Sequence, residues 1–146
     1  MPVWRIVMRY CRAIATPPTE YLPKARAAAL KALQLDDRLA EAHTSLALIT
    51  ENYDWDWTTA EKEYHRAIEL NPNYATAHHW YAEYLTWQGR FDEAFREGER
   101  ARQLDPLSLI IAADNGMILY YSRQYDRAKR RSTLCSKWNQ TSGGPI

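Results

Sequence analysis

Apolar residues recur along most of this chain at the three- and four-residue spacing of amphipathic helices. From Ala77 to Leu85 they follow this spacing and lead to Gly89, whose permissive backbone suits the end of a helix. A second helix begins near Asp92 and stops before Pro106, which cannot continue a helix interior. The pattern predicts helices at about residues 3–15, 21–35, 38–52, 58–70, 74–88, 92–104, 108–122 and 125–138.

These helical pairs repeat with a period of 34 residues, the signature of a repeat architecture. A shift of this size places residues 57–72, WTTAEKEYHRAIELNP, on residues 91–106, FDEAFREGERARQLDP. A weaker third copy runs from Leu119 to Cys135. The identities between the first two copies are Ala60/Ala94, Glu63/Glu97, Arg66/Arg100, Ala67/Ala101, Leu70/Leu104 and Pro72/Pro106.

Upstream of these copies the shift grows to 35 residues. Residues 40–47, AEAHTSLA, match residues 75–82, ATAHHWYA. Residues 25–37 lie 35 residues before residues 60–72, AEKEYHRAIELNP, which belong to the second helix of the next unit. One extra residue in the turn around Tyr53 and Asp54 accounts for the first of these differences.

Small, large and proline positions follow one another in the order of the tetratricopeptide repeat (TPR) family, which the chain resembles. His78 stands where that family usually has tryptophan. Gly98 stands where it usually has a large aromatic residue, which Tyr64 provides in the preceding unit. The resemblance implies an all-α fold, a right-handed superhelix of antiparallel helix pairs, or TPR-like α-solenoid. It is carried by Ala82, Gly89, Phe91, Ala94, Ala101 and Pro106.

The repeat register predicts a single TPR-like domain over residues 1–138 and a disordered tail at 139–146. Repeat arrays normally finish with a polar capping helix, and the residues after Trp138 are too few for one. Two interpretations stay open: the chain is an excerpt of a longer array, or its exposed end pairs with another copy. The expected units are a leading partial unit at 1–36 and full units at about 37–72, 73–106 and 107–138.

The sequence of the repeats resembles the carboxy-terminal repeat regions of bacterial signalling and regulatory proteins. The resemblance is carried by the segments AEAHTSLA, AIELNPNYATAHHWYAEYL and LDPLS, in this order. A formal net charge of +1 gives no overall field that would favour nucleic acid or a membrane surface. Cys11 and Cys135 are too far apart in the sequence for a CxxC motif, and we expect both to be reduced and buried. We therefore expect a cytoplasmic protein whose partner is neither nucleic acid nor a membrane.

No glycine-rich phosphate loop, nucleophile elbow or HExxH helix is present, so we expect no enzyme, no catalytic residue and no cofactor. His79 and Glu83 lie one helical turn apart and could face one metal ion. Two ligands do not make a metal site, so an ordinary polar pair is the better interpretation. In the turn ENYDWDW, the carboxylates of Glu51, Asp54 and Asp56 could bind a cation. The interleaved aromatic residues and the missing glycine favour a packed turn instead.

His43 and His78 occupy equivalent places in successive units, which favours a structural role. Cys135 stands where earlier units place Ala67 and Ala101, so a small buried residue is the better interpretation than a reactive thiol. The basic run at 123–137 is typical of a solvated helix face.

By resemblance to the family, the first helix of each pair lines a concave groove that binds a peptide or a partner helix. The family's lysine, asparagine and arginine clamp for a terminal carboxylate is absent. Glutamates beside aromatic residues favour an aromatic or aliphatic segment that carries positive charge. The alternative is a self-associating module that dimerises through its terminal helix, a homo-oligomer formed by exposed repeat ends. The expected groove residues are Glu41, Thr44, Leu48, Glu51, Asn52, Thr76, His79, Glu83, Thr86, Trp87, Ile110, Ala113, Met117, Tyr120 and Tyr121.

Overall fold

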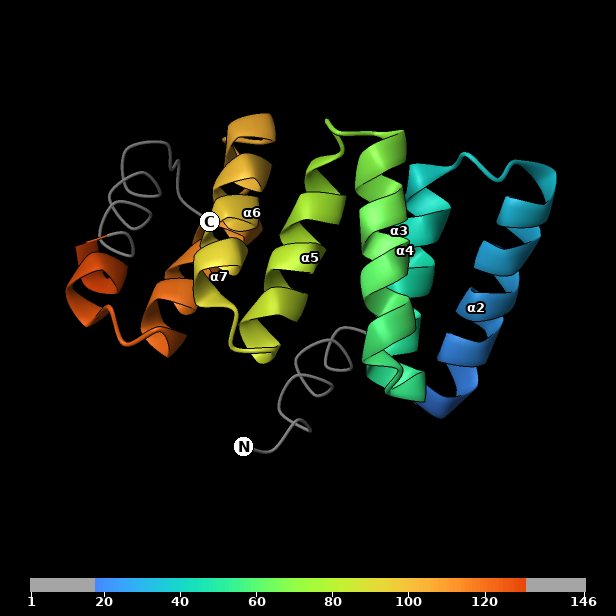
Figure 1. The fold of residues 1–146 in the computed structure, drawn as a ribbon, viewed down its shortest axis with the longest axis horizontal. Coiled ribbons are helices and arrows are strands. Elements are labelled where there is room, and N and C mark those ends of the chain that lie inside the picture. Colours follow the sequence, from blue (N-terminus) through green and yellow to red (C-terminus); the bar gives the residue numbers. More distant parts are fainter. Residues whose placement is uncertain (1–17, 131–146) are drawn as a thin grey trace, which may run out of the picture. The chain divides into compact units, whose positions relative to one another are not determined.

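A computed structural model of the chain describes residues 18–130, and every regular element in that range is helical (Figure 1). The expected all-α class is confirmed for these residues. Within residues 18–130, no helix is both long and apolar enough to cross a membrane. The expected helix at 3–15, both cysteines and the tail at 139–146 lie outside the described range.

The chain forms two compact units, Met1–Pro72 and Asn73–Ile146, and their boundary coincides with a predicted boundary between repeats. The single-domain organisation stays a prediction. The first unit contains α2 (Pro18–Leu35), α3 (Ala40–Ile49), the π-helical turn η1 (Thr50–Asp54) and α4 (Trp57–Leu70). The second contains α5 (Ala75–Trp87), α6 (Phe91–Leu104) and α7 (Leu109–Tyr121), followed by helical residues 125–130.

Alanines at the helix crossings allow the two backbones of each hairpin to approach closely. In the first unit α3 packs on α4, and Ala47, Ala60 and Ala67 are completely buried. In the second unit α5 packs on α6, and Ala94 and Ala101 are completely buried. A small side chain at such a position leaves room for the facing helix to fill the core at close-packed density. These are the small positions that the repeat pattern predicted.

A left-handed residue ends the first helix of the three described pairs that begin with α3, α5 and α7. Trp55, Gly89 and Arg123 have φ angles of 59°, 76° and 62°, and successive members are 34 residues apart. After Gly89 the Arg90 N–H donates to the Leu85 carbonyl, and one repeat later the Gln124 N–H donates to the Leu119 carbonyl. Each bond spans five residues, as in a Schellman motif. The role predicted for Gly89 is confirmed, and two non-glycine residues adopt the same conformation.

The extra residue in the first unit is taken up by a π-helical turn. The expected α-helix at 38–52 is wrong at its end: α3 stops at Ile49, and η1 follows. The Asp56 N–H reaches back to the Thr50 carbonyl, a span of six residues where the equivalent bonds span five. An inserted residue widens one helical turn into an i→i+5 turn, which preserves the left-handed exit at Trp55.

Gly98 marks a close contact between α6 and α7. A Cβ atom built on Gly98 would lie 1.9 Å from Oδ1 of Asn115, and the Asn115 amide nitrogen donates to the Gly98 carbonyl at 2.7 Å. The equivalent residue in the first unit is the fully buried Tyr64. The departure from the family's aromatic residue therefore admits a polar side chain from α7 rather than leaving a gap.

We expect Gly89→Ala to lower the free energy of unfolding by about 1–2 kcal/mol, because an L-residue is strained in the left-handed region. No atom lies within 4 Å of the added Cβ, so the cost is confined to the backbone. The matched control is Gly116→Ala inside α7, also without a neighbour within 4 Å, which should raise stability by about 0.5–1 kcal/mol. Urea unfolding followed by circular dichroism measures both. Equal signs for the two changes would contradict the assignment of the turn.

Gly98→Ala should cost about 1–3 kcal/mol, because the new methyl group displaces the buried Asn115 amide. The test is a double-mutant cycle with Asn115→Ala, in which the double variant should lose less than the sum of the two single variants. Strict additivity of the unfolding free energies would show that the two residues do not share this space.

Candidate functional site

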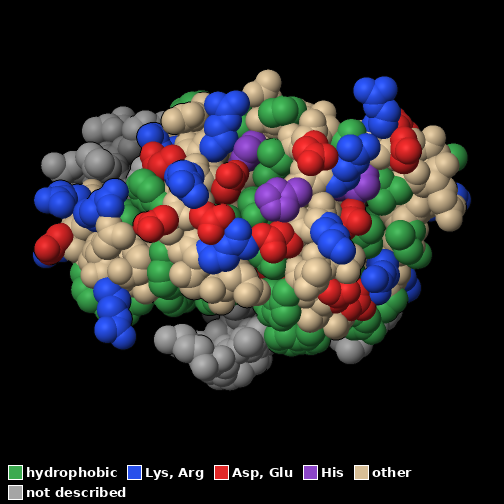
Figure 2. Space-filling model, viewed as in Figure 1, with side chains coloured by type: hydrophobic (Ala, Val, Ile, Leu, Met, Phe, Trp, Pro, Cys, Tyr) green, Lys and Arg blue, Asp and Glu red, His purple; other side chains and the backbone are tan. Residues whose placement is uncertain are grey.

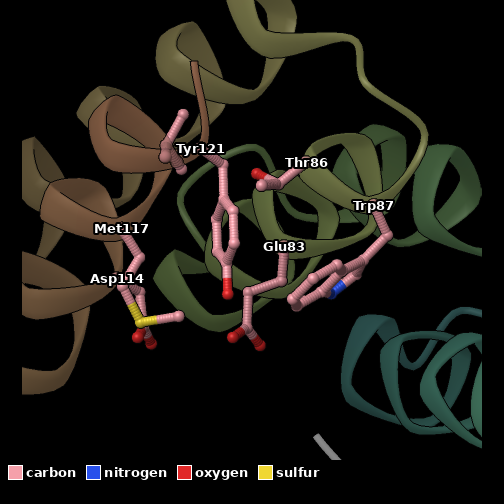
Figure 3. Close-up of a pocket in the computed structure, with 7 residues that line it drawn as sticks. Glu83, Thr86, Trp87, Asp114, Met117 and Tyr121 are labelled. Atoms are coloured by element: carbon pink, nitrogen blue, oxygen red, sulfur yellow. The ribbon is translucent and has the colours of Figure 1, made fainter. Parts of the chain in front are cut away.

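The second unit holds a small pocket between α5 and α7 (Figure 3). Two aromatic side chains stand at its edge: the Trp87 and Tyr121 rings are 5.4 Å apart at an angle of 60°, and both are half-buried. The pocket itself is a hollow of about 10 Å³, comparable to one water molecule. Its lining residues are Glu83, Thr86, Trp87, Asp114, Met117, Ile118 and Tyr121.

Carboxylates from both helices reach this pocket. Glu83 and Asp114 place their side chains toward the same space, and the Tyr121 hydroxyl oxygen points between them (Figure 3). Behind Asp114, its Oδ2 lies 2.8 Å from Nε2 of His79, and both side chains are at least nine-tenths buried. The ligand atoms of His79, Glu83 and Asp114 all lie within 4.8 Å of one another.

The structure brings half of the groove residues expected in the second unit to this pocket. Glu83, Thr86, Trp87, Met117 and Tyr121 line the pocket. Thr86 is buried, and its hydroxyl donates to the Ala82 carbonyl at 2.7 Å. A second, larger hollow is lined by Ala113, Met117 and Tyr120 together with residues after α7. Ile110 is exposed and lines neither pocket, and Thr76 is half-buried away from both.

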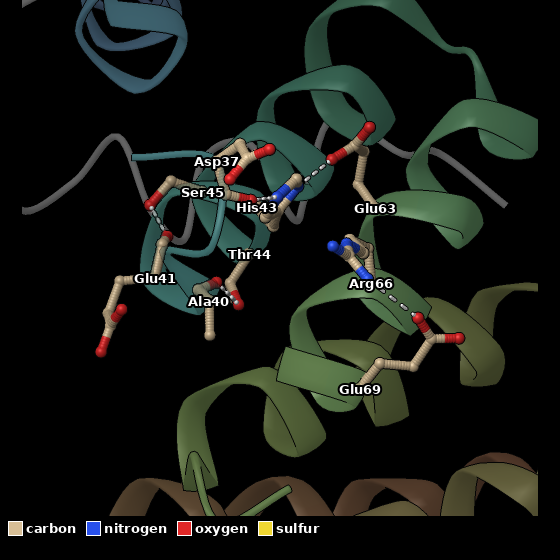
Figure 4. A network of polar contacts seen from close by, with 9 residues as sticks. All are labelled: Asp37, Ala40, Glu41, His43, Thr44, Ser45, Glu63, Arg66 and Glu69. Carbon is tan, nitrogen blue, oxygen red and sulfur yellow. Dashed lines mark hydrogen bonds and ion pairs between the residues drawn. The ribbon is translucent and has the colours of Figure 1, made fainter. Parts of the chain in front are cut away.

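In the first unit several expected groove residues bond within their own hairpin. Thr44 is fully buried, and its hydroxyl donates to the Ala40 carbonyl at 2.8 Å (Figure 4). Glu51 is buried and accepts a hydrogen bond from the Tyr64 hydroxyl at 3.0 Å. Asn52 donates to the Leu48 carbonyl, and both are half-buried. Glu41 is the one member of this set that is exposed.

The turn ENYDWDW is held by hydrogen bonds and an ion pair, whereas Tyr53, Asp54, Trp55 and Asp56 are exposed, so the expected packed turn is wrong for these four residues. Asp54 forms an ion pair with Arg26 at 2.7 Å, in addition to the bond between Glu51 and Tyr64. Asp56 caps α4 and accepts hydrogen bonds from the Thr59 hydroxyl at 2.6 Å and the Thr59 N–H at 3.0 Å. These bonds to Thr59 lower the pKa of Asp56 below its ordinary value.

In each of two successive hairpins, a histidine of the first helix bonds to a glutamate of the second helix. Nδ1 of His43 lies 2.6 Å from a carboxylate oxygen of Glu63 (Figure 4), and Nδ1 of His78 lies 2.6 Å from the carboxylate of Glu97. Glu63 and Glu97 are one of the identical pairs of the repeat. The recurrence therefore comes from a structural bond within each hairpin. His79, the neighbour of His78, bonds to the other side, toward α7.

Sequence reasoning missed Asp114. It is 35 residues beyond His79 and has no carboxylate counterpart in the earlier repeats, so the period did not point to it. The available signal was the pair Asp114–Asn115 inside the apolar run LIIAADNGMIL. A buried polar residue in such a run needs a partner, and both have one: His79 for Asp114 and the Gly98 carbonyl for Asn115.

Charges of both signs are interspersed on the molecular face drawn in Figure 2. This distribution agrees with the net charge of +1 and gives no single-sign field on that face. The carboxylates of Glu83 and Asp114 therefore matter as a local feature, concentrated beside two aromatic rings.

No family model and no curated protein sequence matches the chain. Among solved structures, it resembles the MamA protein with a TM-score of 0.71 and 20% identity, over 88% of this chain and 71% of that one. It also resembles Pseudomonas aeruginosa PilF with a TM-score of 0.53 and 20% identity, over 88% of this chain and 72% of that one. Both are TPR proteins, and the similarity establishes a TPR-like fold for this chain.

Proposed function

We propose that this TPR-like chain is a non-catalytic protein-interaction scaffold that binds a peptide or helix of a protein partner along α5 and α7. The observation that carries the proposal is the Trp87–Tyr121 pair at the edge of a pocket with two carboxylates. Half-buried aromatic rings offer a partner a large apolar contact area from a rigid helical support. The resemblance of the repeats to bacterial regulatory proteins adds a bacterial setting to the proposal, and the expected cytoplasmic location belongs to it as well.

The chemistry of the pocket favours a segment that combines an apolar side chain with a lysine or arginine. Glu83 and Asp114 attract a cation, while the faces of Trp87 and Tyr121 stabilise it by cation–π contact. Met117 and Ile118 supply the apolar part of the lining. The pocket lining contains no lysine, arginine or asparagine that would hold a terminal carboxylate, so an internal segment fits better than a chain end.

The test is selection from a randomised peptide library displayed on phage, followed by affinity measurement on the selected peptides. Trp87→Ala combined with Tyr121→Ala should weaken binding at least about tenfold, since aromatic anchors carry most of the binding energy in such grooves. Tyr53→Ala combined with Trp55→Ala is the matched control, because it removes two exposed aromatic residues of the first unit.

Circular dichroism verifies that both double variants remain folded. Unchanged affinity in the Trp87/Tyr121 variant, or equal losses in the two variants, would remove the pocket from the account. A Glu83→Gln variant should reduce the preference for lysine and arginine among the selected peptides, because it removes one of the two negative charges.

Self-association is a second candidate function, favoured by exposed apolar side chains around the two ends of α7. Leu107 and Ile110 are 70% and 65% exposed, and Tyr120 and Tyr125 are 59% and 55% exposed. Apolar surface of this kind commonly marks an interaction site.

Light scattering across a concentration series separates the two functions. Self-association predicts a molecular mass that rises toward twice 17.1 kDa at micromolar concentration, and Ile110→Lys with Tyr120→Lys should return the monomer. A constant monomer mass at high micromolar concentration would exclude this second candidate.

A further inference from the structure

We infer that His79, Glu83 and Asp114 form a binding site for a divalent first-row transition ion, with Zn²⁺ as the preferred ion. This site shares Glu83 and Asp114 with the proposed peptide groove, but it adds His79 and needs no protein partner. The spacing of His79 and Glu83 alone is a common surface arrangement. Asp114 changes its meaning, because it adds a third donor from another helix.

The distances suit an ion at the centre of the three side chains. Nitrogen and oxygen ligands of Zn²⁺ lie about 2.0–2.2 Å from the ion, so neighbouring ligands of a tetrahedral site are about 3.4 Å apart. Here His79 Nε2 and Asp114 Oδ2 are 2.8 Å apart, and the widest separation among the three ligand atoms is within 4.8 Å. Binding would replace the His79–Asp114 hydrogen bond by a bond from each side chain to the ion.

The donor set selects the class of ion. One imidazole nitrogen with two carboxylate oxygens suits Zn²⁺ and its first-row neighbours, whereas Mg²⁺ and Ca²⁺ prefer oxygen ligands throughout. Two carboxylates also balance the charge of a divalent ion, which reduces the cost of holding it beside buried side chains. The adjoining hollow of about 10 Å³ is large enough for one water molecule as a fourth ligand.

The geometry distinguishes this histidine from the others that have a carboxylate nearby. His43 and His78 each have one bonded carboxylate, Glu63 and Glu97, and His65 lies 3.8 Å from Glu61. Within residues 18–130, only His79 belongs to a group of three or more candidate ligands. His78 is therefore a control of matched burial and adjacent position.

The experiment is isothermal titration of the full chain with ZnCl₂, supported by the visible absorption of Co²⁺ at the same site. A background with Cys11→Ser and Cys135→Ser removes thiol ligands outside the described residues, and no histidine tag is used. We expect one ion per chain in this background. His79→Gln and Glu83→Gln should each weaken binding at least about tenfold, while His78→Gln leaves the affinity within about twofold of the parent, because that ring does not belong to the ligand group.

Glu83→Gln keeps the inference testable if His79→Gln fails to fold, because its side chain is half-buried and nearly the same shape. Added Zn²⁺ should raise the midpoint of thermal unfolding of the parent and the His78 variant but not of the Glu83 variant. Lack of saturable binding by the parent would overturn the site. So would an equal loss in the His78 and His79 variants, which would indicate diffuse histidine binding.

The outcome is separable from that of the peptide groove. Trp87→Ala with Tyr121→Ala contributes no ligand atom to the ion, so this variant should keep its Zn²⁺ affinity within about twofold while losing peptide affinity. His79→Gln should lose Zn²⁺ affinity and keep its affinity for those selected peptides that are apolar and uncharged. A Zn²⁺ affinity that falls with the aromatic pair would contradict the assignment of the three ligands.

Discussion

Close approach of two helical backbones is the constraint on which each hairpin depends. The positions where the helices cross are occupied by alanines with no exposed surface, among them Ala47 and Ala60 in the first unit and Ala94 and Ala101 in the second. A larger side chain there would separate the helices and expose the neighbouring apolar residues. The 34-residue period in the sequence records this requirement, because each hairpin must repeat the same crossing.

The left-handed turn between the two helices is kept although its sequence and the length of the preceding helix change. Gly89 adopts its φ of 76° without strain, whereas Trp55 and Arg123 adopt theirs at a steric cost. The first unit also has one residue more than its successor, and a π-helical turn absorbs it before Trp55. The helix register changes, and the exit conformation does not. The helix type thus varies between the units, whereas the backbone conformation with which the chain leaves the helix stays the same.

Polar bonds differ between equivalent places of the two units. His43 and His78 join the helices within their hairpins, and Glu51 bonds to the buried Tyr64. In the second unit, the Glu83 and Asp114 carboxylates line a pocket together with the half-buried Trp87 and Tyr121, and Asp114 also bonds to His79. A scaffold of repeated hairpins can therefore carry different chemistry in equivalent places, because the crossing alanines and the turns recur in both units.

The sequence alone determined the helical pairs, their period, the small positions and the left-handed turn at Gly89, because these follow from local spacing and backbone preference. The expected groove residues were taken from the repeat register of the family. That register gives positions along a helix but not which of them are buried, and Thr44 and Glu51 are buried. Only the tertiary structure revealed the π turn and the role of Asn115 beside Gly98. It alone also placed Asp114 next to His79, since contacts between helices far apart in the sequence depend on packing, which no local pattern encodes.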